Sequence, residues 1–280
     1  MNKGKRGCDV VIFCGGRGTR LSEWTREMPK PLIELGKAPI LWHIMKIYEQ
    51  AKYRKFILAL GYKGEMIEDY FLHRYKLTKD FELDTKNKKI TNISEKPRFY
   101  NNIDNHRVFA NEAWRIAFVE TGLGAKTATR LLRCREYIHT SPFMVTYGDG
   151  VADIDLGALL ARHRQLRKEH GVIGTITITH PYSKYGITSL RSDLVERFQE
   201  KPLMNEYINV GFMVLEDGIF DYISEREDVM FEETLQQVAA DGLLGYYIHD
   251  GFWHAMDTYK DYEDLNRMWK EGPQWKIWSE

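Results

Sequence analysis

Closely spaced glycines and arginines follow a short apolar stretch near the start of the chain, in the segment Cys14-Gly15-Gly16-Arg17-Gly18-Thr19-Arg20. Glycine has no side chain, so the backbone can turn tightly and bring its N–H groups against a ligand. Successive N–H groups that face one way bind phosphate oxygens, and an arginine adds a forked cation. For the segment taken alone, a glycine-rich turn without a ligand is the alternative. The residues predicted to bind the phosphates of a nucleotide are Gly15, Gly16, Gly18, Thr19 and Arg20.

The spacing of this segment excludes two well-known phosphate loops. The pattern G-x-x-x-x-G-K-[ST] requires Gly-Lys where the chain has Arg20-Leu21. The dinucleotide pattern G-x-G-x-x-G requires a third glycine where the chain has Leu21. The segment is therefore a phosphate loop of another kind.

A lysine enclosed by prolines follows in Met28-Pro29-Lys30-Pro31. Proline fixes its own backbone angle and holds the preceding residue near extended geometry, which restricts where the Lys30 ammonium can point. A lysine pinned shortly after a phosphate loop is suited to contact a bridging phosphate. A solvated turn lysine is the alternative.

The order of apolar runs and helical patterns predicts the elements that position these residues. Strand-like runs alternate with segments of helical periodicity, beginning with a strand over Asp9–Phe13 and a helix over Pro39–Ala51. Such alternation is typical of an α/β fold, here a Rossmann-like mixed, mainly parallel sheet with helices on both faces. Ligands of such sheets bind beyond the carboxyl ends of the strands. The other predicted strands are Phe56–Leu60, Trp114–Val119, Phe143–Thr146, Ile173–Thr179, Val195–Phe198, Tyr207–Leu215 and Leu243–His249, and the other helices Glu65–Tyr75, Ala128–Tyr137, Leu156–His170, Glu232–Asp241 and Tyr259–Lys270.

We expect one domain over residues 1–280. The polar stretch 79–105 is rich in Lys and Asn and is interpreted as an excursion over the surface. A helical tail over residues 259–280 forms a small C-terminal appendage. Its tryptophans and Trp253 occur at a density typical of a core or a subunit interface, which we favour over ligand stacking.

Charge and cysteine content exclude several partners. Lys+Arg and Asp+Glu both number 40, so no net charge attracts nucleic acid or a membrane surface. No apolar run approaches the roughly 20 residues of a membrane span, and Val10–Phe13 is too short for a signal-peptide core. The three cysteines are odd in number and lack C-x-x-C spacing, which argues against a disulfide framework or a zinc site. We expect a cytoplasmic protein with no nucleic-acid or membrane partner.

The motifs, in their order along the chain, resemble the sugar-1-phosphate nucleotidyltransferase superfamily and, within it, the glucose-1-phosphate cytidylyltransferases. The resemblance implies transfer of a cytidylyl group from CTP to a sugar 1-phosphate, with glucose 1-phosphate as the expected acceptor and a CDP-sugar and pyrophosphate as products. It also implies a homo-oligomer. The matching segments extend from Val10 to about Trp278 and are Gly15–Arg20, Pro29–Pro31, Pro39–His43, Thr146–Asp153, Phe198–Pro202, Gly251–Trp253 and Met256–Thr258.

The resemblance implies a role for a metal ion. Asp149 and Asp257 match the family's metal-binding carboxylates, and a few hard oxygen ligands completed by phosphates and water suit Mg²⁺. A turn aspartate and a helix cap are the alternatives. Arg20, Lys30 and Lys201 are implied as the catalytic cations.

Further roles concern the two substrates. Lys201 matches the lysine that contacts the sugar phosphate, Glu200 the carboxylate that contacts sugar hydroxyls, and Asn209 an acceptor-side asparagine. Arg130 matches an arginine close to the nucleotide, with a helix-surface arginine as the alternative. The earlier tripeptide Glu95-Lys96-Pro97 lacks the preceding Phe-x and is interpreted as unrelated.

The reaction requires neutralisation of phosphate charge more than it requires a general base. A phosphomonoester is mostly ionised near neutral pH because its second pKa is about 6, so it can attack the α-phosphorus directly. Bringing anions together is then the task of lysine, arginine and Mg²⁺.

The chain departs from the cytidylyltransferase pattern mainly on the acceptor side. Ala128-Thr129 replaces Gly-Gly, Val210 replaces a glycine, and Tyr182–Thr188 follows its family segment loosely. Because a Cβ narrows the room beside a backbone, another phosphate or phosphonate acceptor stays open. A metal-dependent glycosyltransferase is a further alternative, because Asp153-Ile154-Asp155 is a D-x-D sequence. A nucleotide-sensing subunit would be expected to have lost a metal carboxylate.

Overall fold

The computed structural model describes residues 7–18, 21, 25–77, 79–87, 89–97, 113–224, 226 and 228–279. Thr19 and Arg20 of the predicted phosphate loop lie outside the described residues, as do residues 98–105 of the predicted excursion. Within the described part, no helix is both long and apolar enough to cross a membrane. The single domain over residues 1–280 stays a prediction.

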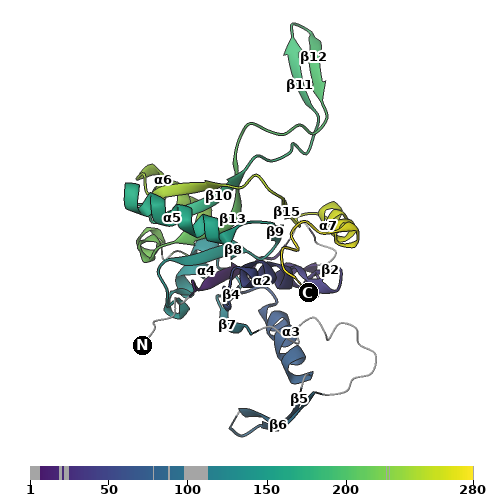
Figure 1. The fold of residues 1–280 in the computed structure, drawn as a ribbon, viewed down its shortest axis with the longest axis vertical. Coiled ribbons are helices and arrows are strands. Elements are labelled where there is room, and N and C mark those ends of the chain that lie inside the picture. The colour runs from purple at the N-terminus through teal and green to yellow at the C-terminus, as the bar shows by residue number, and fades with distance from the viewer. Residues whose placement is uncertain are drawn as a thin grey trace.

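A seven-stranded sheet forms the body in the order β14-β10-β13-β8-β1-β4-β7 (Figure 1). Strands β8, β1, β4 and β7 are mutually parallel, β14 is parallel to β10, and β13 runs antiparallel between β10 and β8. The mixed, mainly parallel sheet predicted from the sequence is confirmed. The strands are β1 Val10–Phe13, β4 Lys55–Leu60, β7 Arg115–Glu120, β8 Phe143–Tyr147, β10 Gly174–Thr179, β13 Ile208–Leu215 and β14 Leu244–Ile248.

Helices cover both faces of this sheet, as predicted. Alternate residues of a strand point to opposite faces, so Val10 and Ile12 join one apolar layer and Val11 and Phe13 the other. Helices α2 and α5 pack into the first layer, and α4 and α6 into the second. The helices are α2 Ile40–Gln50, α3 Gly64–Leu77, α4 Thr127–Arg133, α5 Leu156–His170, α6 Phe231–Ala240 and α7 Tyr259–Glu271.

Two hairpins leave the body at opposite ends (Figure 1). One consists of β5 (Lys79–Asp84) and β6 (Lys89–Pro97) and is the described part of the predicted excursion. The other, which we call the arm, consists of β11 (Ile187–Arg191) and β12 (Leu194–Gln199). The strand predicted over Val195–Phe198 therefore exists, but it pairs with β11 and lies outside the main sheet.

The C-terminal segment packs on α2. Of the core or subunit interface predicted for the tryptophans, Trp275 and Trp278 join a core, since Trp275 is fully buried and Trp278 is 8% exposed. The Trp275 indole N–H donates to Nδ1 of His43, whose other ring nitrogen donates to the carbonyl of Leu35. The helix predicted over Tyr259–Lys270 is confirmed as α7, which ends at Glu271 because Gly272-Pro273 follows, so the described rest of the predicted tail is not helical.

Candidate functional site

The carboxyl ends of parallel strands bring the predicted site residues to one edge of the sheet. Strand β1 leads into the glycine loop (Cys14–Gly18), and β8 leads to Asp149. A short antiparallel pair, β9 and β15, brings Asp257 to the same edge, where the Met256 N–H donates to the Asp149 carbonyl at 2.9 Å. The pair covers Gly150–Ala152 (β9) and Trp253–Ala255 (β15).

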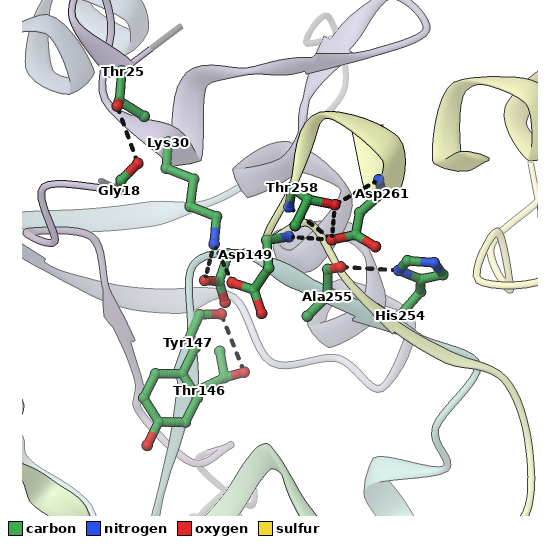
Figure 2. Close-up of polar contacts among 11 residues, drawn as sticks. Gly18, Thr25, Lys30, Thr146, Tyr147, Asp149, His254, Ala255, Thr258 and Asp261 are labelled. Carbon is green, nitrogen blue, oxygen red and sulfur yellow. Dashed lines mark hydrogen bonds and ion pairs between the residues drawn. The ribbon is translucent and has the colours of Figure 1, made fainter. Parts of the chain in front are cut away.

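Lys30 joins the two carboxylates that the sequence predicted as metal ligands (Figure 2). Its Nζ lies 2.7 Å from Oδ2 of Asp149 and 2.9 Å from Oδ1 of Asp257. The lysine begins a single 3₁₀ turn, η2 (Lys30–Leu32), between Pro29 and Pro31, and its side chain is only 12% exposed. The two prolines thus hold Lys30 so that one ammonium neutralises two carboxylates.

The pKa of the Lys30 ammonium reflects two opposing effects. Burial disfavours the charged form and lowers the pKa. The charges and hydrogen bonds of Asp149 and Asp257 outweigh burial, so the pKa of Lys30 is raised above its usual value. The lysine is therefore cationic at every physiological pH.

The helix-cap role considered for Asp257 is filled by its neighbours Thr258 and Asp261. Helix α7 begins at a capping box: the Asp261 N–H donates to the hydroxyl of Thr258, the N-cap, and the Asp261 carboxylate accepts from the Thr258 N–H (Figure 2). The carboxylate of Asp257 instead contacts Lys30. Asp149 likewise directs its carboxylate to Lys30 and not into its own turn.

The glycine loop is held from behind through its carbonyl groups. The Gly15 carbonyl accepts hydrogen bonds from the Tyr62 N–H at 3.2 Å and from Nη2 of Arg130 at 3.0 Å. A trans peptide is planar, so the N–H of Gly16 points away from these donors. Gly16 is exposed, and a Cβ built there meets nothing within 4 Å. The loop therefore has open space on the side where a phosphate would contact its N–H groups.

Arg130 is a buried residue and not a helix-surface arginine. Its side chain extends from α4 beneath the ends of the strands, where Nη1 donates to the Leu60 carbonyl at 2.7 Å and to the Thr121 hydroxyl at 2.6 Å. A Cβ on Gly15 or Gly61 would approach the guanidinium to 2.2 or 2.3 Å, so both positions require glycine. Burial lowers the pKa of Arg130. Direct contact between Arg130 and a nucleotide stays a prediction.

Asn209 lies on β13 with its side chain oriented by the backbone. Its amide oxygen accepts a hydrogen bond from the Gly211 N–H at 3.0 Å. The amide nitrogen is therefore the group that can donate a hydrogen bond to an acceptor substrate. Gly211 has a φ of 88°, and a Cβ there would come within 2.4 Å of the Tyr147 ring. The position after Val210 is thus the one in this segment that requires glycine.

The structure does not bring Glu200 and Lys201 to Lys30, Asp149 and Asp257. They follow the arm, which stands away from the body (Figure 1). Their side chains are 63% and 50% exposed, and Nζ of Lys201 lies 3.5 Å from Oε1 of Glu200. Within one chain, the acceptor-side pair is therefore separate from the carboxylate pair.

The D-x-D sequence serves the fold. Asp155 is the N-cap of α5 and accepts the Ala158 N–H at 2.9 Å, while Ile154 is buried. Asp153 lies 3.1 Å from Nε2 of His249. In the described part of the chain, no group of three or more His, Cys, Asp or Glu residues is arranged to hold a metal ion. The capping contact of Asp155 thus gives this motif a role in the fold.

Three departures from the family pattern do not narrow the site. Ala128 is fully buried in the core, Thr129 donates to the Arg226 carbonyl, and Val210 is 5% exposed within the core. The expectation that these side chains take room from a substrate was wrong, because all three point into the protein.

Sequence reasoning missed the residues that support the loop from below. Thr25 and Tyr62 contact the glycine loop through a hydroxyl and a backbone N–H. Tyr62 lies between Gly61 and Gly64 directly after strand β4, and Thr25 lies in a charged stretch before Pro29, but neither pattern by itself marks a residue that supports a phosphate loop. The spacing between Thr25 and Lys30 is the one feature that could have drawn attention to Thr25.

The chain matches the nucleotidyl transferase family model over residues 9–272. It is 40% identical over 271 residues to a probable glucose-1-phosphate cytidylyltransferase of Bacillus subtilis, covering 96% of this chain and 99% of the relative. It is 38% identical over 272 residues to glucose-1-phosphate cytidylyltransferase of Salmonella typhimurium, again with 96% and 99% covered.

Solved structures share the fold. The UTP-bound UGPase of Acinetobacter baumannii superposes with a TM-score of 0.65 at 16% identity, covering 96% of this chain and 95% of that one. A UDP-glucose pyrophosphorylase complexed with UDP-glucose superposes with a TM-score of 0.63 at 16% identity, covering 94% and 98%. The Rossmann-like architecture is thereby confirmed. By the match of its sequence along nearly the whole length, the chain belongs to the nucleotidyl transferase family.

Proposed function

We propose that this nucleotidyltransferase transfers the cytidylyl group of CTP to glucose 1-phosphate. The observation that carries the proposal is the Lys30 ammonium held between Asp149 and Asp257 at the sheet edge, beside the glycine loop. Such a cluster suits a reaction between anions, because its lysine and any bound metal ion neutralise phosphate charge. The names of the full-length relatives support the choice of CTP and glucose 1-phosphate.

The carboxylate pair fits a magnesium ion. Nucleotidyl transferases generally use a divalent metal, and here two carboxylate oxygens already converge on one cation, the Lys30 ammonium. Asp149 and Asp257 would hold Mg²⁺ through few protein ligands, as that ion prefers. When bound, the ion neutralises part of the triphosphate charge.

The chain's own residues position the reacting groups. An ionised oxygen of the sugar phosphate forms a bond to the α-phosphorus of CTP, the bond to the β-phosphate oxygen breaks, and pyrophosphate leaves with that electron pair. Lys30 and the N–H groups of the glycine loop balance the charge of the triphosphate. No base is needed, since the attacking phosphate is already ionised near pH 7.

We further propose that the enzyme is a homo-oligomer in which the arm of one copy reaches the acceptor side of another. Apolar side chains of the arm are exposed, with Leu190 at 71%, Leu194 at 74% and Phe198 at 63%. Exposed apolar area of this kind marks an interaction surface. The separation of Glu200 and Lys201 from the carboxylates of their own chain supports a partner copy as the place where they act. A cytoplasmic location stays a prediction.

Pyrophosphate release tests the reaction. CTP, UTP, dTTP, ATP and GTP are each paired with glucose 1-phosphate, other sugar 1-phosphates and a phosphonate, and CTP with glucose 1-phosphate should be fastest. Release with UTP or dTTP but not CTP would remove the cytidine assignment. No release with any pair would remove the transferase proposal.

Subunit mixing tests the shared site. The variants Lys201→Ala and Asp257→Asn should each be nearly inactive, and mixing them under conditions of subunit exchange should restore activity. Size-exclusion chromatography with light scattering gives the oligomeric state. A monomer, or no recovery on mixing exchanged subunits, contradicts the shared site and leaves the reaction assignment intact.

A further inference from the structure

Thr25 connects the glycine loop to the segment that carries Lys30. Its side chain is polar, yet the residue is only 3% exposed. The hydroxyl lies 3.1 Å from the carbonyl of Gly18, as Figure 2 shows, and 3.1 Å from that of Leu21. A hydroxyl has one proton to donate, so these two carbonyls share it. The contact to Leu21 is a common local one, whereas the contact to Gly18 reaches back into the loop.

The methyl group of Thr25 also contacts the loop. Gly18 has a φ of 60°, and a Cβ there would lie 2.6 Å from Cγ2 of Thr25 and 3.5 Å from Cβ of Lys30. Thr25 thus packs against the Cα of Gly18 on the side that Lys30 shares. The left-handed backbone and the close approach both require glycine.

The segment around Thr25 is anchored from a second side. The Tyr62 hydroxyl donates to the Thr25 carbonyl at 3.0 Å, and the Lys63 ammonium donates to the Arg26 carbonyl. The Tyr62 N–H also donates to the Gly15 carbonyl. Thr25 and Tyr62 together hold both ends of the described loop in fixed relation to the segment before Lys30.

The direction of the Gly18 carbonyl affects phosphate binding because its oxygen carries partial negative charge. A carbonyl oxygen carries partial negative charge, so a carbonyl that faced the triphosphate would repel its oxygens. The Thr25 hydroxyl and the Leu21 N–H, at 2.9 Å, both engage the Gly18 carbonyl and keep it turned toward the protein. The loop can then offer N–H groups, and no carbonyl at Gly18, to an anion.

We propose that Thr25 is a positioning residue for the triphosphate, acting through the Gly18 carbonyl and the spacing between the loop and Lys30. The inference rests on the proposed function, in that it assumes a nucleoside triphosphate in the loop. Thr25 itself touches no substrate. Its contribution is to nucleotide affinity, and the acceptor is bound without it.

Isothermal titration with a non-hydrolysable CTP analogue and Mg²⁺ tests the inference directly. Thr25→Val keeps the shape and removes the hydroxyl, and it should weaken binding of the analogue about 5- to 10-fold, as expected for one lost hydrogen bond. Thr25→Ser keeps the hydroxyl and should stay within about 2-fold of the wild type. In turnover, Thr25→Val should raise the KM for CTP and leave the KM for the acceptor unchanged.

Thr177→Val is the matched control. Thr177 is fully buried in β10, and its hydroxyl has no hydrogen-bond partner in the described part of the chain. This variant should bind the analogue as the wild type does. Thr25→Ala replaces Thr25→Val if the latter does not fold.

The inference is overturned if removal of the Thr25 hydroxyl leaves the affinity unchanged, if Thr25→Ser binds as poorly as Thr25→Val, or if Thr177→Val weakens binding equally. Binding of the analogue is measured without turnover. A failure of the proposed reaction would therefore appear in the pyrophosphate assay, independently of this result.

Discussion

Replacing Lys30 by methionine should make the free protein a better binder of divalent cations. The ammonium lies 2.7 and 2.9 Å from the carboxylates of Asp149 and Asp257, so a metal ion that enters this pair must displace it. Two unit charges at such a distance interact by about 6 kcal/mol at an effective dielectric constant of about 20. Desolvation and the roughly 30% exposure of both carboxylates reduce the net value to about 1–3 kcal/mol.

Methionine has a similar length and no charge, so Lys30→Met removes this competition. We expect the Mn²⁺ dissociation constant of the nucleotide-free protein to fall about 10-fold or more, since 1.4 kcal/mol corresponds to a factor of ten. Electron paramagnetic resonance of free Mn²⁺ at low ionic strength measures it. The double variant Lys30→Met/Asp149→Asn should lose the gain, and turnover of Lys30→Met with CTP should fall by orders of magnitude. Equal Mn²⁺ affinity in Lys30→Met and wild type would refute the shared cation site.

Three further outcomes follow from the structure. Asp155→Ala should cost about 1 kcal/mol of unfolding free energy through the lost N-cap, with kcat and KM unchanged; a large fall in kcat would contradict the purely capping role. Gly211→Ala should lower the unfolding free energy by about 1–3 kcal/mol, because φ is 88° and the new Cβ meets the Tyr147 ring, and it should raise the acceptor KM more than the CTP KM. Burial, together with nearby arginine charges, lowers the pKa of His163 to about 4. Because the folded state favours the neutral form, the stabilisation that His163 gives the fold is complete above pH 6.5 and is lost as the pH falls towards 4. The free energy of unfolding should fall by about 3 kcal/mol for this reason. Urea unfolding from pH 7 to 4.5 should show a smaller fall for His163→Gln than for the wild type.

The sheet and its covering helices could be predicted from the sequence because their signals are local. Strand β1 and helix α2 are apolar where they meet the core, and a proline marks the start of α2. The place of Asp149 after β8 follows from the same pattern. That Asp257 lies beside it does not, since the pairing of β9 with β15 depends on contacts far apart in the chain.

The place of the arm outside the main sheet and the burial of Arg130 could not be predicted, for a different reason. The apolar residues of β12 have the composition of a sheet strand, and composition does not reveal whether a strand joins the main sheet or pairs in a hairpin outside it. A guanidinium is usually exposed, and Arg130 is buried because it finds acceptors at the ends of separate strands. Both outcomes depend on the assembled fold.

The residues that depart from the family pattern form two groups according to where their side chains point. Those at Ala128, Thr129 and Val210 face the core, so they leave the substrate side of the site unchanged. The departures over Tyr182–Thr188 lie at the base of the arm, where Tyr182 is 72% and Tyr185 is 78% exposed. If the arm acts on a second copy, as proposed, these residues approach an acceptor bound to that copy and not to their own chain. Discrimination between glucose 1-phosphate and another acceptor is then a property of the assembly, because the residues that differ and the carboxylates they serve belong to different chains.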